Sequence, residues 1–250
     1  MLTNIHPALV LLFLAKWVHR DISTGNIIVV EDDKGCVCGF LSDLEYAKAM
    51  SNESLSSDPK TVCFDVKDRS CLTFDQGTPY FIPLEIHAGK RHPEFYGNPS
   101  PRSFEELEQD FDNVPLNLPV VILRYNHYHD LESLMWVALW IVFGRVNWEA
   151  AKKIWPKIFM NSASPSDMRR EFFITLGSPS RASFIDAFHP ELLPVFPRGF
   201  EMIRKEIWCI CMVSEPKERD YHKCFNSLIF AFDRLLLAVD GKADVVPLVV

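Results

Sequence analysis

Residues 18–29 read Val18-His19-Arg20-Asp21-Ile22-Ser23-Thr24-Gly25-Asn26-Ile27-Ile28-Val29. The spacing His-Arg-Asp-x-x-x-x-Asn within this stretch is specific, because a chance match at four fixed positions is rare in one chain. Two short apolar runs, Ile27–Glu31 and Cys36–Leu41, follow on either side of Asp32-Asp33-Lys34-Gly35. This pattern predicts a β-hairpin in which Gly35 takes the positive φ of a tight turn.

The predicted hairpin brings polar side chains together at its open end. If Glu31 faces Cys36, antiparallel pairing places Asn26 opposite Leu41, with Asp43 just past the second strand. Cross-strand neighbours lie about 5 Å apart and diagonal neighbours about 7–8 Å apart. The Asn26 amide and the Asp43 carboxylate are therefore expected to reach one small cation, and such oxygen ligands suit Mg²⁺ bound to phosphates.

Helical periodicity dominates the rest of the chain. Residues 7–16 are predicted to end an apolar helix, and Asp130–Phe143 is predicted to be the central helix, N-capped by Asp130 and ended by Gly144. Further helices are expected over 148–159, 165–176, 200–213 and 218–239, the second of them begun by Ser164-Pro165-x-Asp167. Residues 50–76 and 86–128 are expected to be long loops, with a short acidic helix capped by Ser103-x-x-Glu106 in the second. The predicted fold class is mainly α with a small β-hairpin.

Composition narrows the possible functions. The 250 residues carry 26 basic and 33 acidic side chains, a net charge of −7, and 48% of them are hydrophobic. A chain of this kind can bury a sizeable core, and its acidic balance argues against nucleic acid or an anionic membrane as its main partner. The apolar run Ala8–Ala15 is too short to span a bilayer and lacks the basic flank and cleavage site of a signal peptide. We expect a cytoplasmic or nuclear protein.

The seven cysteines give no metal-site pattern. Cys36/Cys38 and Cys209/Cys211 are Cys-x-Cys pairs without further ligands at zinc-site spacing. Reduced, buried thiols in an intracellular protein are the expected state.

Four blocks in this order resemble the fungal-type protein kinase domain, and specifically its C-terminal lobe. They are Val18–Val29, Ser42-Asp43-Leu44-Glu45, Gly77-Thr78-Pro79-Tyr80-Phe81-Ile82-Pro83-Leu84-Glu85 and His129-Asp130-Leu131-Glu132-Ser133-Leu134. The resemblance implies that residues 1–250 form one protein kinase-like large lobe, with the small lobe absent. Its parts would be a catalytic loop at 18–26, a metal-site hairpin at 27–45, an activation segment at 43–85, the central helix at 130–143 and a helical remainder at 148–239.

The resemblance also implies catalytic roles. Asp21 resembles the catalytic-loop base that accepts the proton of a substrate hydroxyl, and Asn26 and Asp43 resemble the two magnesium ligands. Arg20 would reach toward the activation segment. The implied function is serine/threonine protein kinase activity, with ATP and Mg²⁺ as cofactors and an unidentified protein as substrate.

Three further residues are assigned structural roles by the same resemblance. Glu85 would pair with an arginine from a late helix, for which Arg219 is the candidate, although an ordinary surface ion pair is an equal alternative. Asp130 would accept backbone N–H groups of the catalytic loop while also capping its helix.

The chain also departs from the family pattern. Kinases place a glycine-rich loop, a strand lysine and a helix glutamate before the His-Arg-Asp sequence, and only 18 residues precede His19 here. Ser23 stands where serine/threonine kinases usually carry a lysine, and Asp43-Leu44-Glu45 replaces Asp-Phe-Gly. We therefore expect little or no turnover from these 250 residues alone.

Three hypotheses remain open from the sequence. The chain is a truncated part of an active protein kinase, a kinase-like binding module without catalysis that uses its helical lobe and the loops at 46–76 and 86–128, or a small-molecule phosphotransferase of the aminoglycoside-kinase type. The Gly77–Glu85 block argues against the last, because it resembles a platform for protein substrates. A missing small lobe also predicts exposed apolar surface near Leu11–Leu14 or Ile27–Val30, with self-association through it as the consequence.

Overall fold

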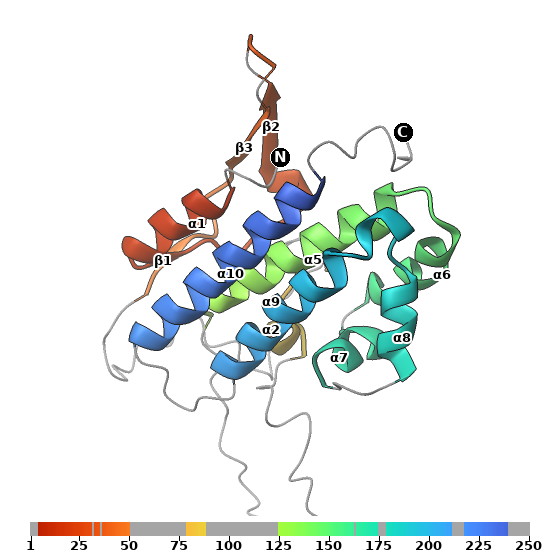
Figure 1. Cartoon of the computed structure of the whole chain (residues 1–250). Helices are drawn as coiled ribbons and strands as arrows, with labels where there is room; N and C mark the ends of the chain where they lie inside the picture. The colour runs from red at the N-terminus through yellow and green to blue at the C-terminus, as the bar shows by residue number, and fades with distance from the viewer. Residues whose placement is uncertain are drawn as a thin grey trace, which may run out of the picture.

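A computed structural model describes residues 5–31, 33–35, 37–50, 79–88, 125–162, 164–174, 179–211 and 218–239. Within them, helices build the body of the molecule, and a β-hairpin projects from one end (Figure 1). Helix α5 (His127–Arg145) runs through the middle of this body. The mainly helical architecture with small antiparallel sheets agrees with the predicted fold class.

Helix α5 is the core of the fold, as its apolar sequence predicts. Its buried residues extend continuously from His127 to Leu139. The predicted N-cap is wrong, however, because the helix begins three residues before Asp130 and Asn126 caps it. The Asn126 side chain accepts a hydrogen bond from the Tyr128 N–H, which leaves the Asp130 carboxylate available for groups outside the helix.

The predicted end of α5 at Gly144 is also wrong, since the helix continues to Arg145. Gly144 serves packing instead: a Cβ atom there would lie 2.7 Å from the Trp155 indole nitrogen. Trp155 belongs to α6 (Glu149–Ile158), so this glycine allows the two helices to approach closely.

Helix α1 (Ile5–Leu14) is the apolar helix predicted to end over residues 7–16, although it ends two residues earlier, and it covers one side of α5. Leu9 and Phe13, four residues apart and therefore on one face, are buried, and the Phe13 ring stacks on Phe225 at 4.9 Å. Leu11 and Leu14 on the same helix are 67% and 60% exposed. The apolar surface predicted near Leu11–Leu14 is present.

The hairpin consists of β2 (Ile27–Glu31) and β3 (Val37–Leu41), close to the predicted strands, and Gly35 has the expected positive φ of 79°. The register is displaced by one residue from the prediction: Glu31 pairs with Val37, and Ile27 pairs with Leu41. The physical reason lies at the base of the hairpin. Directly opposed residues point to the same face, so this register turns both Ile27 and Leu41 toward the core.

A second, very short sheet was not expected from the sequence. Strand β1 (Trp17–Val18) pairs antiparallel with β4 (Lys48–Ala49), and the Met50 N–H donates to the Lys16 carbonyl at 2.7 Å. This sheet fixes the chain immediately before His19 against the chain immediately after Glu45. It therefore positions both arms of the candidate site.

The remaining helices pack around α5. They are α2 (Leu84–Ala88), α6, α7 (Asp167–Ile174), α8 (Pro179–Asp186), the 3-10 helix η4 (Pro190–Leu192), α9 (Phe196–Cys211) and α10 (Glu218–Val239). Helix α7 is capped by Ser166, whose hydroxyl accepts the Arg169 N–H, rather than by the predicted Ser164. Helix α8 was not predicted. The predicted loop 50–76 and the Ser103-x-x-Glu106 helix lie outside the described residues, apart from Met50.

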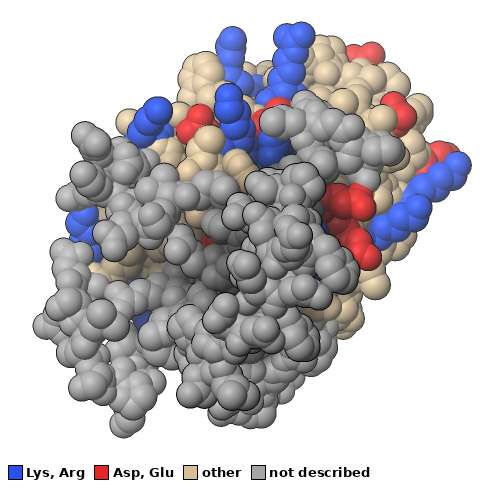
Figure 2. All heavy atoms as spheres, turned by 90° about the horizontal axis from the view of Figure 1, so that it is seen from below, with Lys and Arg blue, Asp and Glu red and all other residues tan. Residues whose placement is uncertain are grey.

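The surface of the described residues carries charge of both signs. On the face seen from below the view of Figure 1, lysine and arginine side chains are interspersed with aspartate and glutamate (Figure 2). Of the helices that the structure describes, none has the length and apolar character needed to cross a membrane.

Candidate functional site

The loop between β1 and β2 is attached to the first turn of α5 by one carboxylate. Asp130 is only 3% exposed, and its two oxygens accept the backbone N–H groups of His19, at 2.7 Å, and Arg20, at 2.9 Å. Burial raises the pKa of Asp130, and these two N–H donors oppose the rise. The backbone contacts that the sequence resemblance implied for Asp130 are present.

His19 is fully buried and joins the loop to the chain that follows β3. Its Nδ1 accepts the Asp21 N–H at 3.3 Å, so the proton belongs on Nε2, which lies 3.0 Å from the Ser42 carbonyl oxygen. Both ring nitrogens are therefore engaged in holding backbone. His19 is thus a buried residue whose ring holds the loop and the residue before Asp43 together.

Asp21 and Asn26 are in direct contact. The Asn26 side-chain nitrogen donates to Asp21 twice, to the carboxylate oxygen Oδ2 at 2.7 Å and to the backbone carbonyl at 2.9 Å. The backbone carbonyl of Asn26 accepts two hydrogen bonds from Ser42, one from its N–H at 2.9 Å and one from its hydroxyl at 3.1 Å. Asn26 therefore stands opposite Ser42, not Leu41 as predicted. Asp43 follows Ser42 directly in the chain, and its place beside Asp21 and Asn26 stays a prediction.

Two residues of this region have backbone that L-amino acids rarely adopt. Arg20 has φ 74° and Asp43 has φ 62°, each at a cost of about 1–2 kcal/mol. The Arg20 backbone is held by Asp130, and its guanidinium lies 5.9 Å from the centre of the Tyr125 ring. Partial burial lowers the pKa of Arg20. Strained residues held by surrounding bonds are typical of functional loops.

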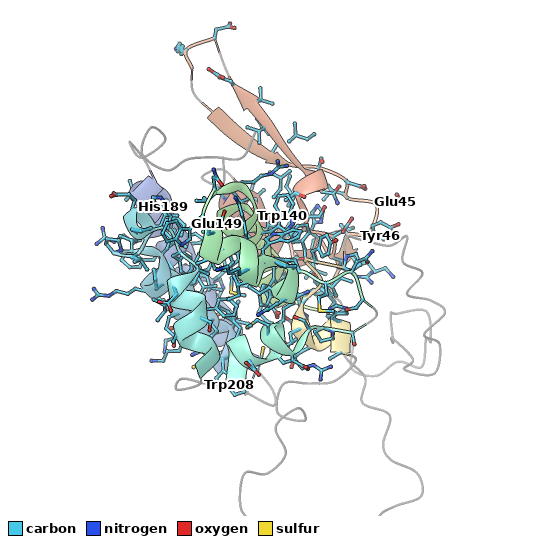
Figure 3. All side chains as sticks on the ribbon, turned by 90° about the vertical axis from the view of Figure 1, so that its right-hand side faces the viewer. Glu45, Tyr46, Trp140, Glu149, His189 and Trp208 are labelled. Carbon is cyan, nitrogen blue, oxygen red and sulfur yellow. The ribbon has the colours of Figure 1, made fainter. Side chains whose placement is uncertain are left out.

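The possible ligands of the site are oxygens of mixed type. Among the described residues, no three or more His, Cys, Asp and Glu side chains form a group that could hold a metal ion. The candidate site instead offers the carboxylates of Asp21 and Asp43 and the amide of Asn26. Asp43 is exposed, and its carboxylate accepts the Glu45 N–H at 3.3 Å. Glu45 and Tyr46 lie near the foot of the hairpin (Figure 3), away from the part of the helical body marked by His189 and Trp208.

Glu85 lies apart from this group, at the start of α2. Its carboxylate is 1% exposed and accepts the Tyr128 hydroxyl at 2.9 Å and the His129 Nε2 at 3.1 Å. His129 Nδ1 accepts the Asn126 N–H, so Nε2 carries the proton that it donates to Glu85. Arg219 lies within α10, but its side chain is outside the described residues, so the Glu85–Arg219 pair stays a prediction.

Two buried charges that the sequence reasoning missed hold residues 79–84. Glu132 accepts the Leu84 N–H at 2.7 Å and the Trp136 indole N–H at 2.9 Å. Arg169 donates to the carbonyls of Pro79, at 3.2 Å, and Ile82, at 2.6 Å. Its guanidinium also covers the Trp136 ring at 4.3 Å. A second acid two residues after Asp130, inside an apolar helix, was a signal for Glu132, since such a group needs buried partners. No comparable signal marked Arg169.

Comparison with protein families gives a match to the model described as fungal protein kinase, over residues 4–142. The match covers more than half of the chain. The chain belongs to the fungal protein kinase family. Neither the curated proteins nor the solved structures contain a match to this chain.

The matched region of this fungal protein kinase contains every residue of the group described above, from His19 to Asp130, and also Glu85 and Glu132. Arg169 and Arg219 lie beyond it. The buried attachment of residues 79–84 therefore joins the family-matched part of the kinase to the later helices.

Proposed function

We propose that this chain carries the phosphoryl-transfer machinery of a serine/threonine-type protein kinase, with Asp21 as base and Asn26 and Asp43 as metal ligands. The supporting observation is the contact between Asp21 and Asn26, at 2.7 Å, together with the bonds that tie Asn26 to Ser42 beside Asp43. Asp21 and Asn26 come from the loop before β2, and Asp43 follows Ser42 on the other arm of the chain. Arg20 and Asp130 belong to the same proposal as residues that position the loop.

The donor set fits a magnesium–nucleotide complex. Mg²⁺ prefers oxygen ligands and is commonly bound through one or two carboxylates together with phosphate oxygens. Asp43 is exposed and can meet a ligand from solvent. The side-chain nitrogen of Asn26 points at Asp21, which leaves the side-chain oxygen of Asn26 as the atom that would bind a cation. When bound, Mg-ATP would supply the transferable phosphoryl group and neutralise its charge.

The side chains of this chain would do the rest by positioning. The Asn26 side chain holds the Asp21 carboxylate in place through Oδ2, and this carboxylate would take the proton of a substrate hydroxyl. Asp130 fixes the loop through two backbone N–H groups. Glu132 and Arg169 fix residues 79–84, which would face the protein substrate. Small displacements of such groups reduce rates strongly, because catalysis here depends on orientation.

The test is thermal unfolding of the chain with and without Mg-ATP, compared with the Asp43→Asn variant. At ten times its dissociation constant the nucleotide should raise the Tm by roughly 3–6 °C. Asp43→Asn should abolish that shift. Asp33→Asn, which removes an equal charge from an exposed position near the hairpin tip, is the matched control and should retain it. A shift of equal size in all three proteins, or in none of them, would contradict the proposal.

A second candidate function is a kinase-like binding module without catalysis. The observation that favours it is the exposed apolar hairpin, where Ile28 and Val30 on β2 and Phe40 on β3 are 50%, 46% and 55% exposed. A binding partner could cover these side chains. The absence of any nucleotide-dependent shift, together with a partner whose binding depends on Phe40, would favour this alternative.

A further inference from the structure

Helices α9 and α10 carry three cysteines near one end of their contact. Cys209 and Cys211 lie in the last turn of α9, and Cys224 lies in the second turn of α10. The two helices run side by side (Figure 1), and Trp208, next to Cys209, marks this end of α9 (Figure 3). Cys211 and Cys224 are buried, as expected from the sequence, but Cys209 is exposed. One thiol of the three is therefore open to solvent.

Two contacts fix the register of this antiparallel helix pair. Gly199 of α9 lies against Leu235 of α10, since a Cβ atom at Gly199 would come 2.5 Å from Leu235 Cδ2. Nearer the other end, the Cys224 thiol lies 3.8 Å from the Glu206 carbonyl oxygen. Cys209 is ten residues beyond Gly199 on α9, and Cys224 is eleven residues before the partner of that glycine on α10. At about 1.5 Å of rise per residue, both steps cover nearly the same length, so the two cysteines lie at one level of the pair.

The Glu206 carbonyl brings the two thiols to the same place. A short side chain on a helix can reach the carbonyl three or four residues before it, and Glu206 is three residues before Cys209. The same carbonyl oxygen accepts the Cys224 thiol. Burial raises the pKa of Cys224 to about 12, and negative charge on Glu206 and on Cys209 adds to the rise, which also reflects their closeness.

This geometry suits a covalent link between the helices. A disulfide joins residues whose Cα atoms lie about 4.4–6.8 Å apart, so it needs two closely packed backbones. A single carbon separates the Cys224 sulfur from its own backbone, and its contact with the α9 carbonyl shows that the helices approach closely at this level. We infer that Cys209 and Cys224 form a reversible disulfide between α9 and α10 when the chain meets a hydroperoxide. Cys209 reacts first because it is exposed, and Cys211, at 1% exposure, stays reduced.

The reaction takes two steps, with hydrogen peroxide as the oxidant. The Cys209 thiolate attacks one peroxide oxygen, the O–O bond breaks, and the departing hydroxide takes up a proton to become water, which leaves a sulfenic acid on Cys209. The sulfur of Cys224 then attacks the sulfur of Cys209, the S–O bond breaks, and the hydroxyl group leaves as water with the Cys224 proton. The two thiols together lose two electrons, and one peroxide becomes two water molecules. A dithiol reductant reverses the link.

The inference is independent of the proposed phosphoryl-transfer function, since neither cysteine belongs to the candidate site. To test it, the reduced, folded chain is treated with hydrogen peroxide and the remaining thiols are alkylated. Tandem mass spectrometry of the unreduced digest then identifies the linked cysteines and separates Cys209 from Cys211. The expected product is a Cys209–Cys224 link within one chain, with a yield that does not change on dilution and that dithiothreitol removes.

Four variants make the test specific. Cys209→Ser should lower the yield of linked Cys224 at least tenfold, and Cys224→Ser should leave on Cys209 a sulfenic acid that dimedone traps. Cys211→Ser should keep the link, and so should Cys38→Ser, the matched control on the hairpin. A Cys211–Cys224 link, covalent dimers joined through Cys209, or a Cys209–Cys224 link that forms only after unfolding in urea would overturn the inference.

Discussion

Replacing Asp130 tests the attachment of the candidate catalytic loop to the helical core. Asp130→Asn keeps the shape of the side chain but leaves only one oxygen to accept the His19 and Arg20 N–H groups. The other N–H would face the amide NH₂, a second donor. A hydrogen bond to a charged group contributes about 1.5–3 kcal/mol. Because burial raises the pKa of Asp130, the charged form also carries a desolvation cost that asparagine removes. The net loss expected is about 2 kcal/mol.

Asp130→Ala should cost more, about 3–5 kcal/mol, since it leaves both N–H groups unpaired around a buried loop. The assay is urea unfolding followed by tryptophan fluorescence, with an unchanged m-value expected for both variants. Hydrogen exchange should also speed up at His19 and Arg20. Asp167→Asn is the matched control, because Asp167 also lies in the first turn of a helix but its side chain is 92% exposed. If Asp130→Asn destabilised the chain no more than this control, the role assigned to Asp130 would be wrong.

Three further predictions concern other parts of the molecule. Arg169→Met should destabilise the chain by about 2–4 kcal/mol, measured by urea unfolding, because it leaves the buried carbonyls of Pro79 and Ile82 unpaired and removes a positive charge that favours ionised Glu132. The neighbouring Arg170→Met should cost under about 1 kcal/mol, and equal losses would contradict the assignment. Burial lowers the pKa of His87 to about 4, below its ordinary 6.5, so the unfolded chain binds a proton that the folded chain does not between these values. Stability should therefore fall as the pH decreases from 6.5 to 4, and His87→Gln should remove roughly 2–3 kcal/mol of that decrease; an unchanged pH profile would refute the sign. Sedimentation should detect concentration-dependent self-association that Phe40→Lys weakens, whereas a monomer at all concentrations would exclude it.

Local sequence signals predicted the parts of the fold that depend on local chemistry. The two hairpin strands, the turn at Gly35 and the extent of α10 followed from alternation, turn residues and helical periodicity. The hairpin register could not be predicted in this way, because it depends on which apolar pair at the base reaches the core. In the structure that pair is Ile27 and Leu41.

Tertiary contacts explain the elements that the sequence concealed. Helix α8 has few apolar residues, yet Phe184 packs against Phe172 at 4.9 Å and Phe143 at 6.0 Å, which holds the helix in place. Helix α9 begins before the predicted residue 200, because Pro197 is tolerated in a first turn, where a missing N–H costs little. Helix propensity alone gave neither result.

The candidate site also combines features that the sequence predicted with features that only the tertiary structure shows. The resemblance assigned Asp21 and Asn26 to one site, and the two side chains are in contact; it also implied the backbone hydrogen bonds that Asp130 accepts. Arg169 lies 87 residues beyond Ile82, the carbonyl that it binds. Nothing in a single sequence connects positions so far apart, since their meeting is a product of the whole helical packing.

The most direct test of the central claim is a Mn²⁺ titration followed by electron paramagnetic resonance in the presence of ATP. The signal of free Mn²⁺ reports how much ion the protein–nucleotide complex takes up. We predict that the parent chain and Asp33→Asn bind one ion equally, and that Asn26→Ala and Asp43→Asn each weaken this binding at least tenfold. Equal uptake by all four proteins would contradict a divalent-cation site formed by Asn26 and Asp43 beside Asp21.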